Sequence, residues 1–331
     1  MTSASRKRSA PEESRPVATA TAAAKKRSRY NFSKIDEYEM LEELGEGTFG
    51  VVVQARHRRT GETVAVKWVR GGASESESDL DAVVREAGCL AACRGHPSVV
   101  QIRDVASDDD TGDLFLVMEL VDGPSLRDWL TRPVPENTAR AFMRQLLSAA
   151  ATMHAAPMAT IHRDIKPENV LVTPGCELIK LCDFGCATPA KPLGKPYPER
   201  RVGTMPYCAP EQLMGIRFYG TAVDVWALGC VMAELLAGEP LFAADTEDDV
   251  LVQMLDLQDG IAAVGLKAFD GVVELSTAGR ELLAGLLSFE PGARLTAAEA
   301  LKHRWFTEEV AEPPAAAKAE FPGFVPLFSA A

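Results

Sequence analysis

The chain has 331 residues, of which 47% are hydrophobic and 25% are charged, as in a soluble globular protein with one large domain or two smaller ones. It holds no run of about 18 apolar residues, which argues against a membrane span, and its seven cysteines form no C-x-x-C pair, which argues against a zinc site or a disulfide framework. Residues 1–34 carry a balance of +7 within a net charge of −12, so the remainder carries −19, and such an acidic body argues against nucleic-acid binding.

Residues 1–37 are predicted to form a disordered basic tail, because this segment is rich in Ser, Ala, Pro and Arg and lacks apolar periodicity. Its clusters RKR (6–8) and KKRSR (25–29) indicate either a nuclear import signal or a merely solvated basic tail. The expected location is therefore nuclear, cytoplasmic or both.

The pattern changes at Tyr38, from which Val-rich runs, a Gly-rich turn and a hairpin turn at Thr60-Gly61 predict three strands up to residue 70. Residues 80–93 predict an amphipathic helix that places apolar side chains on one face. VVQIRDVAS (99–107) and DLFLVMELV (113–121) predict two more strands. The segment 38–121 is thus expected to be a five-stranded sheet with one main helix.

After Gly123-Pro124 the pattern becomes mostly helical. Helices are predicted over residues 125–130, 138–155, 208–214, 221–237, 246–257, 276–288 and 296–303. A β-rich lobe (38–121) followed by a helical lobe (122–306) predicts a ligand site in the cleft between them, and residues 307–331 form a C-terminal tail.

Two features of the first lobe are typical of phosphate binding. GEGTFGVV (45–52) fits G-x-G-x-x-G-x-V, and glycines let a backbone approach phosphate oxygens closely. The motif alone is a weak signal. The missing G-K-[ST] excludes a Walker loop, and the strand that follows excludes a Rossmann motif, which opens a helix. VAVK (64–67) places Lys67 in an apolar strand, where its ammonium needs an anion such as a phosphate or the Glu86 carboxylate. Taken singly, a Glu such as Glu86 is more often a solvated helix residue.

The stretch IHRDIKPENVLVTPGCELIKLCDFG (161–185) holds Asp164, Asn169 and Asp183 between strand-like runs. By themselves these residues fit acid–base chemistry, a metal site or a solvated loop.

Together the motifs resemble the protein kinase family. HRDIKPEN (162–169) matches H-R-D-x-x-x-x-N, DFG (183–185) and APE (209–211) match in order, DVWALGC (224–230) resembles D-x-W-x-x-G, and Arg294 resembles the arginine that pairs with the APE glutamate, Glu211. The resemblance covers residues 38–306 and implies an α+β bilobal kinase fold, with a five-stranded antiparallel N-lobe and a mostly helical C-lobe. HRDIKPEN with Lys166 resembles serine/threonine rather than tyrosine kinases.

The resemblance implies ATP and Mg²⁺ as cofactors and protein as substrate. It assigns catalysis to Asp164, Lys166, Lys67 and Glu86, and Mg²⁺ to Asn169 and Asp183. It assigns nucleotide binding, besides Lys67, to Leu44, Gly45, Glu46, Gly47, Thr48, Phe49, Gly50, Val51, Val52, Ala65, Met118, Glu119 and Val121. MELV (118–121) is the implied hinge, with Met118 as gatekeeper.

Within the family, YEMLEELGEGTFGVVVQARHRRTGETVAVK and HRDIKPENVLV resemble the cyclin-dependent kinases, and KKRSRYNFSKIDEYE and FPGFVPLF resemble the plant F-type members. The resemblance implies a cyclin partner, but the Glu86 helix reads DAVVREAGCL instead of a PSTAIRE-like sequence, which argues against one. MPYCAPE has Cys208 where the group has arginine, which leaves proline-directed specificity open.

Three residues are candidates for regulation. Glu199 aligns with the threonine that the group phosphorylates, so it is either a fixed negative charge for Arg85 and Arg163 or an unpaired surface residue. Thr48 aligns with an inhibitory phosphosite, and Thr204 is expected to brace the substrate loop. The alternatives to an active kinase are a catalytically weak pseudokinase scaffold and a small-molecule kinase on a related fold.

Overall fold

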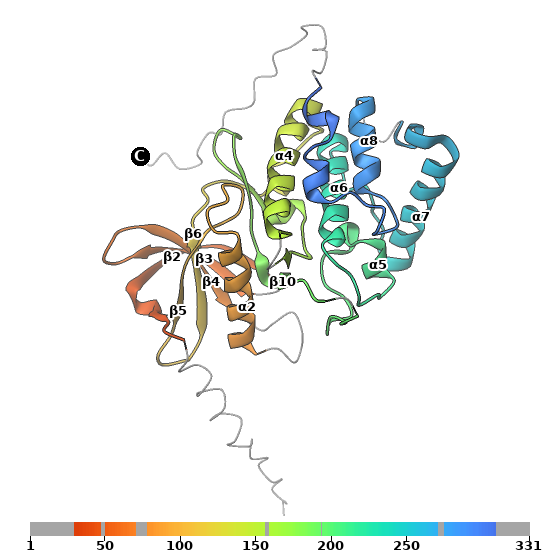
Figure 1. Ribbon diagram of the computed structural model, residues 1–331. Helices are drawn as coiled ribbons and strands as arrows, with labels where there is room; N and C mark the ends of the chain where they lie inside the picture. The colour runs from red at the N-terminus through yellow and green to blue at the C-terminus, as the bar shows by residue number, and fades with distance from the viewer. Residues whose placement is uncertain are drawn as a thin grey trace, which may run out of the picture. The chain divides into compact units, whose positions relative to one another are not determined.

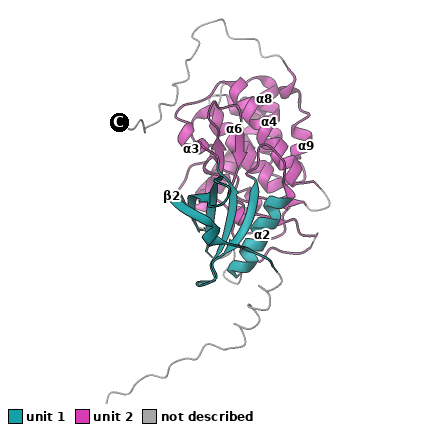
Figure 2. Ribbon diagram, turned by 90° about the vertical axis from the view of Figure 1, so that its left-hand side faces the viewer, with its two compact units in different colours: residues 1–91, 101–120 teal, residues 92–100, 121–331 magenta. Residues whose placement is uncertain are grey.

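The computed structural model describes residues 30–47, 50–70, 78–155, 159–192, 194–270 and 275–308. The chain divides into two compact units, drawn in different colours in Figure 2. Unit 1 comprises residues 1–91 and 101–120, and unit 2 comprises residues 92–100 and 121–331. The two basic clusters of the N-terminal tail and the segment FPGFVPLF lie outside the described residues.

Unit 1 is a sheet with strand order β1-β5-β6-β4-β3-β2 and one long helix (Figure 1). The elements are β1 (Ser33–Lys34), β2 (Tyr38–Gly47), β3 (Gly50–His57), β4 (Thr63–Val69), α2 (Asp79–Ala92), β5 (Ile102–Ser107) and β6 (Leu114–Glu119). Leu80 and Val83 of α2 pack with Val69, Leu114 and Leu116 of the sheet, so the predicted amphipathic helix covers one sheet face. This packing confirms the sheet-and-helix architecture of the first part of the chain.

The sheet has six strands instead of the predicted five. β1 pairs in parallel with β5, Ser33 opposite Ala106 and Lys34 opposite Ser107, whereas the other pairs are antiparallel. Residues 33–37, assigned to the disordered tail, therefore form β1 and the 3₁₀ helix η1 (Ile35–Glu37). The physical reason is Ile35, which is buried against Tyr38, Val64 and Val117 and gives this short segment a place in the core.

Unit 2 is built on helices. They are α3 (Leu126–Trp129), α4 (Glu136–Met153), α5 (Pro210–Leu213), α6 (Ala222–Ala237), α7 (Glu247–Val264), α8 (Thr277–Leu286) and α9 (Ala297–Ala300). α6 is buried from Val223 to Leu236 and lies beside α4 and α8 (Figure 1), as expected of a helix that is apolar on all sides. α7 extends seven residues beyond its predicted end at 257, because Gly260 does not interrupt it. No helix within the described ranges is long and apolar enough to cross a membrane.

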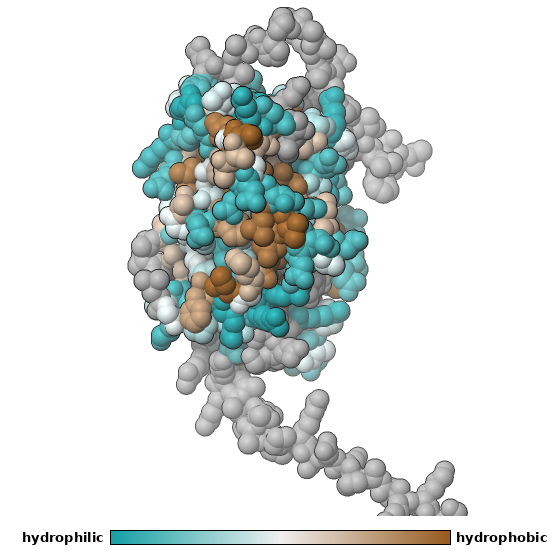
Figure 3. Space-filling model, turned by 90° about the vertical axis from the view of Figure 1, so that its right-hand side faces the viewer, coloured by the Kyte–Doolittle hydropathy of each residue, from teal (hydrophilic) through white to brown (hydrophobic). Residues whose placement is uncertain are grey.

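The side of the molecule on which α7 lies in Figure 1 is shown in space-filling form in Figure 3, where hydrophobic areas are surrounded by hydrophilic ones. The exposed large apolar side chains of α7 are Val252, Leu255 and Val264. Only Val250 and Met254 of this helix are buried, so α7 contributes little to the core.

Two short β-ribbons in unit 2 carry the segments that the motifs mark. β7 (Thr160–Ile161) pairs with β10 (Thr188–Pro189), and β8 (Val170–Val172) pairs with β9 (Ile179–Leu181). HRDIKPEN therefore lies between β7 and β8, and DFG follows β9. Because β8 and β9 are antiparallel neighbours, the end of HRDIKPEN and the start of DFG meet at the same end of one ribbon.

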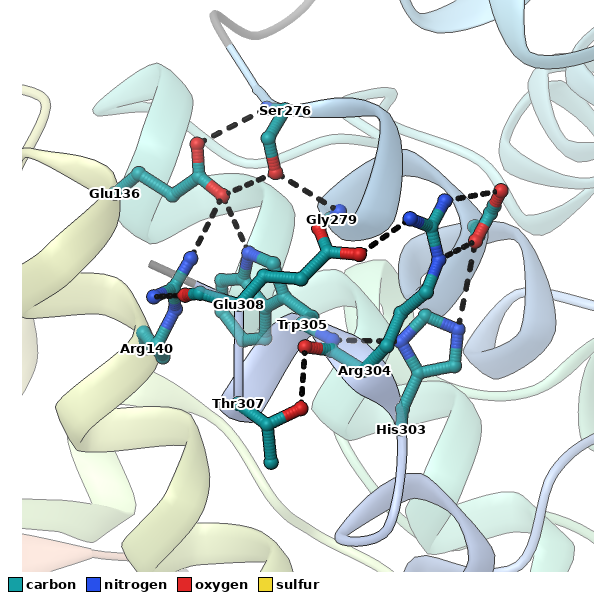
Figure 4. A network of polar contacts seen from close by, with 10 residues as sticks. Glu136, Arg140, Ser276, Gly279, His303, Arg304, Trp305, Thr307 and Glu308 are labelled. Atoms are coloured by element: carbon teal, nitrogen blue, oxygen red, sulfur yellow. Dashed lines mark hydrogen bonds and ion pairs between the residues drawn. The ribbon is translucent and has the colours of Figure 1, made fainter. Parts of the chain in front are cut away.

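A polar network joins the start of α4 to the C-terminal end of the described chain (Figure 4). The Glu136 carboxylate accepts hydrogen bonds from Ser276 N (3.0 Å), Ser276 Oγ (2.6 Å) and Trp305 Nε1. Ser276 is the N-cap of α8, and Trp305 lies in the 3₁₀ helix η6 (Arg304–Phe306). One half-buried carboxylate therefore connects three segments that are far apart in sequence.

Replacing Glu136 by alanine is expected to lower the free energy of unfolding by about 2 kcal/mol, since Trp305 Nε1 and the Ser276 donors lose their acceptor. Urea denaturation followed by fluorescence measures this change. The matched control is Glu136→Gln, which retains one oxygen acceptor and should lose roughly half as much. Equal stability of the alanine variant and the unaltered chain would contradict the role of this network.

Candidate active site

The glycine-rich segment lies where β2 and β3 pair, with Gly47 opposite Gly50, Glu46 opposite Val51 and Gly45 opposite Val52. Gly50 has φ +138° and an added Cβ would lie 1.8 Å from Trp68 O, so only glycine fits there. At Gly45 and Gly47 an added Cβ would meet no described atom within 4 Å. Packing within the described part of the protein does not require glycine at these two positions, whereas a ligand held close to the backbone would.

Lys67 lies in the apolar strand β4 with its side chain 5% exposed, and its Nζ is 2.8 Å from Glu86 Oε1 on α2. The Glu86 side chain is 2% exposed. Removal of two charges from water is costly, and a buried pair requires good geometry and further polar partners. The predicted partnership of these two residues is thus present, in unit 1.

The other predicted nucleotide-binding residues of unit 1 that the structure describes lie on β2, β3, β4 and β6. Ala65 lies opposite Met118 on β6, and both are 8% exposed. Glu119 Oε1 accepts a hydrogen bond from Gln101 N (3.0 Å), which fixes the end of β6. Leu44 is 47% exposed on β2. Thr48 and Phe49 lie outside the described residues, and Val121 is half-buried at the start of unit 2.

In unit 2 the structure brings Asp164, Lys166, Asn169 and Thr204 into direct contact. Thr204 Oγ1 donates to Asp164 Oδ1 (2.7 Å), and Asn169 Nδ2 donates to Asp164 Oδ2 (3.1 Å). Lys166 Nζ donates to Thr204 Oγ1 (2.6 Å) and is 3.1 Å from Asp164 Oδ2. Each polar side chain in this group orients another, so the Asp164 carboxylate is held in one position.

Asp183 has a left-handed backbone conformation (φ +55°), and its Oδ1 accepts a hydrogen bond from Gly185 N (3.3 Å). The next residue, Phe184, is fully buried with its ring centroid 4.7 Å from that of His162. Cys182 N donates to Asn169 O (2.9 Å). The residue before Asp183 is therefore hydrogen-bonded through its backbone to the carbonyl of Asn169. This main-chain contact connects the segments that carry the two predicted metal ligands.

These two side chains fit Mg²⁺ bound together with a nucleotide. Asn169 and Asp183 offer an amide oxygen and a carboxylate, the hard oxygen ligands that Mg²⁺ takes. Mg²⁺ is usually held by one or two carboxylates and completes its coordination with substrate phosphates and water, so one amide and one carboxylate suit it.

Asp224 is a residue whose role the sequence reasoning missed. Its buried carboxylate accepts hydrogen bonds from the backbone N–H groups of His162 and Arg163, both at 2.8 Å, and from His154 Nε2 at 2.9 Å. Burial opposes ionisation, but the hydrogen bond from His154 and those of the backbone hold the pKa of Asp224 below its ordinary value. Asp224 thereby fixes the loop at Arg163, a non-glycine residue with φ +69°.

Arg163 connects this loop to the segment after DFG. Its side chain is 0% exposed, and it donates to Cys186 O (2.7 Å) and to Tyr219 Oη (3.3 Å). Its two terminal nitrogens lie 3.2 and 3.3 Å from the two carboxylate oxygens of Glu199, whose side chain is 9% exposed. Of the two sequence alternatives for Glu199, the unpaired surface residue is wrong.

Cys208 is 8% exposed near Asp164, and its Sγ lies 3.7 Å from Val202 O. Burial, and secondly the Asp164 charge, raise the pKa of this thiol to about 12, so it stays protonated and is a poor nucleophile. Gly203 has φ +106°, and a Cβ there would lie 2.5 Å from Arg163 O. The segment next to Thr204 is thus packed closely against the loop at Arg163.

A buried ion pair joins the APE segment (209–211) to Arg294. Arg294 Nη1 and Nη2 donate to the two carboxylate oxygens of Glu211 at 3.0 and 3.2 Å, and Nη1 also donates to Ala222 O (2.8 Å). The side chains are 0% and 5% exposed. This confirms the pair that the motif resemblance implied.

Comparison with known proteins agrees with this geometry. Residues 38–306 match the family described as "Protein kinase domain". A rice (Oryza sativa subsp. japonica) protein described as "Putative cyclin-dependent kinase F-2" is 42% identical over 314 residues, which cover 85% of this chain and 93% of that protein. "Cyclin-dependent kinase G-2" of Oryza sativa subsp. indica is 35% identical over 83% of this chain, and "Cyclin-dependent kinase G1" of Arabidopsis thaliana is 32% identical over 83%. The chain spans 42% and 49% of those two relatives.

Proposed function

The chain belongs to the protein kinase family as a cyclin-dependent-kinase-like member, and on this premise we propose that it transfers the γ-phosphate of ATP to serine and threonine hydroxyls of protein substrates. The observation that carries the proposal is the contact group in which Thr204, from a separate segment, meets Asp164, Lys166 and Asn169 of one loop. Phosphoryl transfer depends mainly on positioning and charge neutralisation, and this group supplies both.

In unit 1, Lys67 would bind the α- and β-phosphates, because its buried ammonium is already oriented by Glu86. The backbone at Gly45 and Gly47 would approach the phosphates without a Cβ in the way. Ala65, Met118 and Glu119 would bind the adenine, since they line one region of paired strands at β4 and β6.

In unit 2, Asp164 would accept a hydrogen bond from the substrate hydroxyl and orient it toward the γ-phosphate. Lys166 would contact that phosphate as a cation, and its hydrogen bond to Thr204 Oγ1 holds the ammonium beside Asp164. Asn169 and Asp183 would bind Mg²⁺, which neutralises charge on the phosphates when bound. The hydrogen bonds of Asn169 to Asp164 would keep the base and one metal ligand at a fixed separation.

No observation favours the pseudokinase scaffold, because all six polar residues of the kinase set are present. The direct test is incubation with γ-labelled ATP, Mg²⁺ and a generic protein substrate. Labelled Ser or Thr in the substrate is the expected product, and Asp183→Asn is the control variant.

For partners and location, we propose protein substrates and a nuclear or cytoplasmic site of action. The names of the relatives support a cyclin partner, whereas the α2 sequence DAVVREAGCL does not resemble the helix that meets a cyclin. Phosphorylation assays with and without a cyclin test whether the protein requires a cyclin partner.

For regulation, we propose that Glu199 replaces activation-loop phosphorylation. The support is its two-oxygen contact with Arg163, the predicted partner arginine that lies in the same unit. Arg163 directly precedes Asp164 and is stacked on Tyr197, with 5.3 Å between Cζ and the ring centroid. A carboxylate at this position would hold the catalytic loop in place without a phosphate, although with less charge.

Replacing Glu199 by glutamine keeps the size of the side chain and removes its charge. We expect kcat/KM for a protein substrate to fall by about tenfold, because charge-assisted hydrogen bonds are roughly twice as strong as neutral ones. Steady-state phosphorylation by bacterially produced protein, verified as unphosphorylated by mass spectrometry, measures the change. Glu177→Gln, which removes a carboxylate elsewhere in the same unit, is the matched control, and equal activity of the two variants would refute the proposal.

A further inference from the structure

Beside the catalytic loop, unit 2 contains a cluster that the proposed function leaves unused. The Arg127 cluster consists of Arg127 on α3, Glu168 in the 3₁₀ helix η2 (Pro167–Asn169), Tyr207 in the 3₁₀ helix η4 (Met205–Tyr207) and Glu234 on α6. These residues come from four separate segments of the chain. Their meeting point is therefore a product of the fold and has no local sequence signature.

The guanidinium of Arg127 donates hydrogen bonds to all three of the other residues in the cluster. Arg127 Nε donates to Glu168 Oε1 (2.8 Å), while its two terminal nitrogens donate to Glu234 Oε1 and to Tyr207 Oη. Tyr207 Oη in turn donates to Glu234 Oε2 (2.7 Å). The planar fork of an arginine matches such an arrangement of oxygens closely, and an ammonium would reach fewer of them.

The cluster is buried on one side and open on the other. The Glu234 side chain is 0% exposed, whereas Arg127 and Glu168 are 33% and 44% exposed. Burial raises the pKa of Glu234 above its ordinary value, whereas the hydrogen bond from Tyr207 and the charge of Arg127 act in the opposite direction. Two carboxylates share a single cation, so the site without Arg127 would have a strong affinity for another guanidinium.

The cluster is attached to the reacting groups at two points. Glu168 directly precedes Asn169, whose amide donates to Asp164. Tyr207 ends the 3₁₀ helix that follows Thr204, and Thr204 Oγ1 donates to Asp164. A substrate chain whose hydroxyl lies at Asp164 would therefore pass close to the open side of the cluster.

Arg127 is presented on a rigid support. Ser125 caps α3 by accepting from Asp128 N (3.1 Å), and Leu126 is fully buried. Trp129 packs on Phe142 of α4, with ring centroids 5.3 Å apart. The guanidinium is therefore held in place before any substrate arrives.

We propose that Arg127 is a specificity-determining residue, whose guanidinium occupies in cis a carboxylate site that would otherwise bind an arginine of the protein substrate near the phosphorylated hydroxyl. The inference rests on the proposed function. Because the carboxylates are already paired, a substrate arginine gains nothing there and meets a like charge, which disfavours basic substrates. A purely structural role, the connection of α3 to α6, would leave substrate preference unchanged.

The test compares Arg127→Ala with the unaltered chain on serine peptides that carry a single arginine at successive positions, each paired with a citrulline peptide as the neutral isostere. For the best position, we expect the kcat/KM ratio of arginine to citrulline peptide to rise by about tenfold in the variant, mostly through KM, as a charge-assisted bond supports. Arg127→Ala/Glu234→Gln should lose this gain. Arg127→Lys should have an arginine-to-citrulline ratio closer to that of the unaltered chain than the alanine variant has. The matched control is Arg132→Ala, which removes an exposed arginine near α3.

A second readout needs no enzyme activity. Ethylguanidinium should raise the Tm of Arg127→Ala more than that of the unaltered chain or of the double variant, because only the first has the open carboxylate site. If no variant phosphorylates any peptide, the proposed function fails, and the Tm comparison still decides this inference. A folded Arg127→Ala protein without a Tm response, or an active one with an unchanged arginine-to-citrulline ratio, would overturn it.

Discussion

Replacement of Asp183 by asparagine is expected to reduce phosphate transfer to a protein substrate by at least about a thousandfold, because the carboxylate proposed to bind Mg²⁺ loses its charge. The substitution is nearly isosteric, and the amide oxygen can still accept the hydrogen bond from Gly185 N. The left-handed backbone at position 183 also tolerates asparagine. The loss should therefore affect the chemistry and leave the fold intact.

Incorporation of label from γ-labelled ATP measures this loss, and circular dichroism with a thermal scan establishes that the variant is folded. Asp256→Asn on the exposed side of α7 is the matched control and should keep full activity. Equal incorporation by the Asp183 variant and the unaltered protein would contradict the assignment of metal binding to Asp183 and, with it, the proposed function.

The second large effect concerns stability. Replacement of Arg294 by alanine is expected to destabilise unit 2 by about 3–5 kcal/mol, because it leaves the Glu211 carboxylate buried without its partner. The loss also frees Ala222 O at the start of the central helix α6. Removal of both charges, in Arg294→Met/Glu211→Gln, should recover part of the loss, since no uncompensated charge then remains buried.

Urea denaturation followed by tryptophan fluorescence suits this measurement, because Trp129, Trp226 and Trp305 lie in unit 2 and only Trp68 lies in unit 1. Arg304→Ala is the matched control, as Arg304 forms ion pairs with Glu281 and Glu308 that are largely exposed. Exposed pairs contribute little, so this variant should change stability much less. A similar small change for Arg294→Ala would show that the buried pair is not a main support of unit 2.

Local sequence patterns predicted the elements well where their periodicity was strong. The helix over 80–93 and the strands around it appear as α2 and β2 to β6, because the alternation of apolar and polar residues reflects which side faces the core. β1 was missed, since two residues in a polar segment carry no periodicity and only Ile35 marks their attachment. The predicted helix over 246–257 was too short, since α7 continues through Gly260 to Val264.

The sequence by itself determined the family, the residue types of the candidate site and the order of the elements, because the kinase motifs are short, local and fixed in spacing. Only the tertiary structure decided which distant side chains meet. Asp224 binds the backbone of a loop 61 residues earlier, Glu199 pairs with Arg163 across 36 residues, and Arg127 reaches Glu234 across 107 residues. Such contacts depend on how helices and loops pack around a common core, and packing is a property of the whole chain that no local window of residues records.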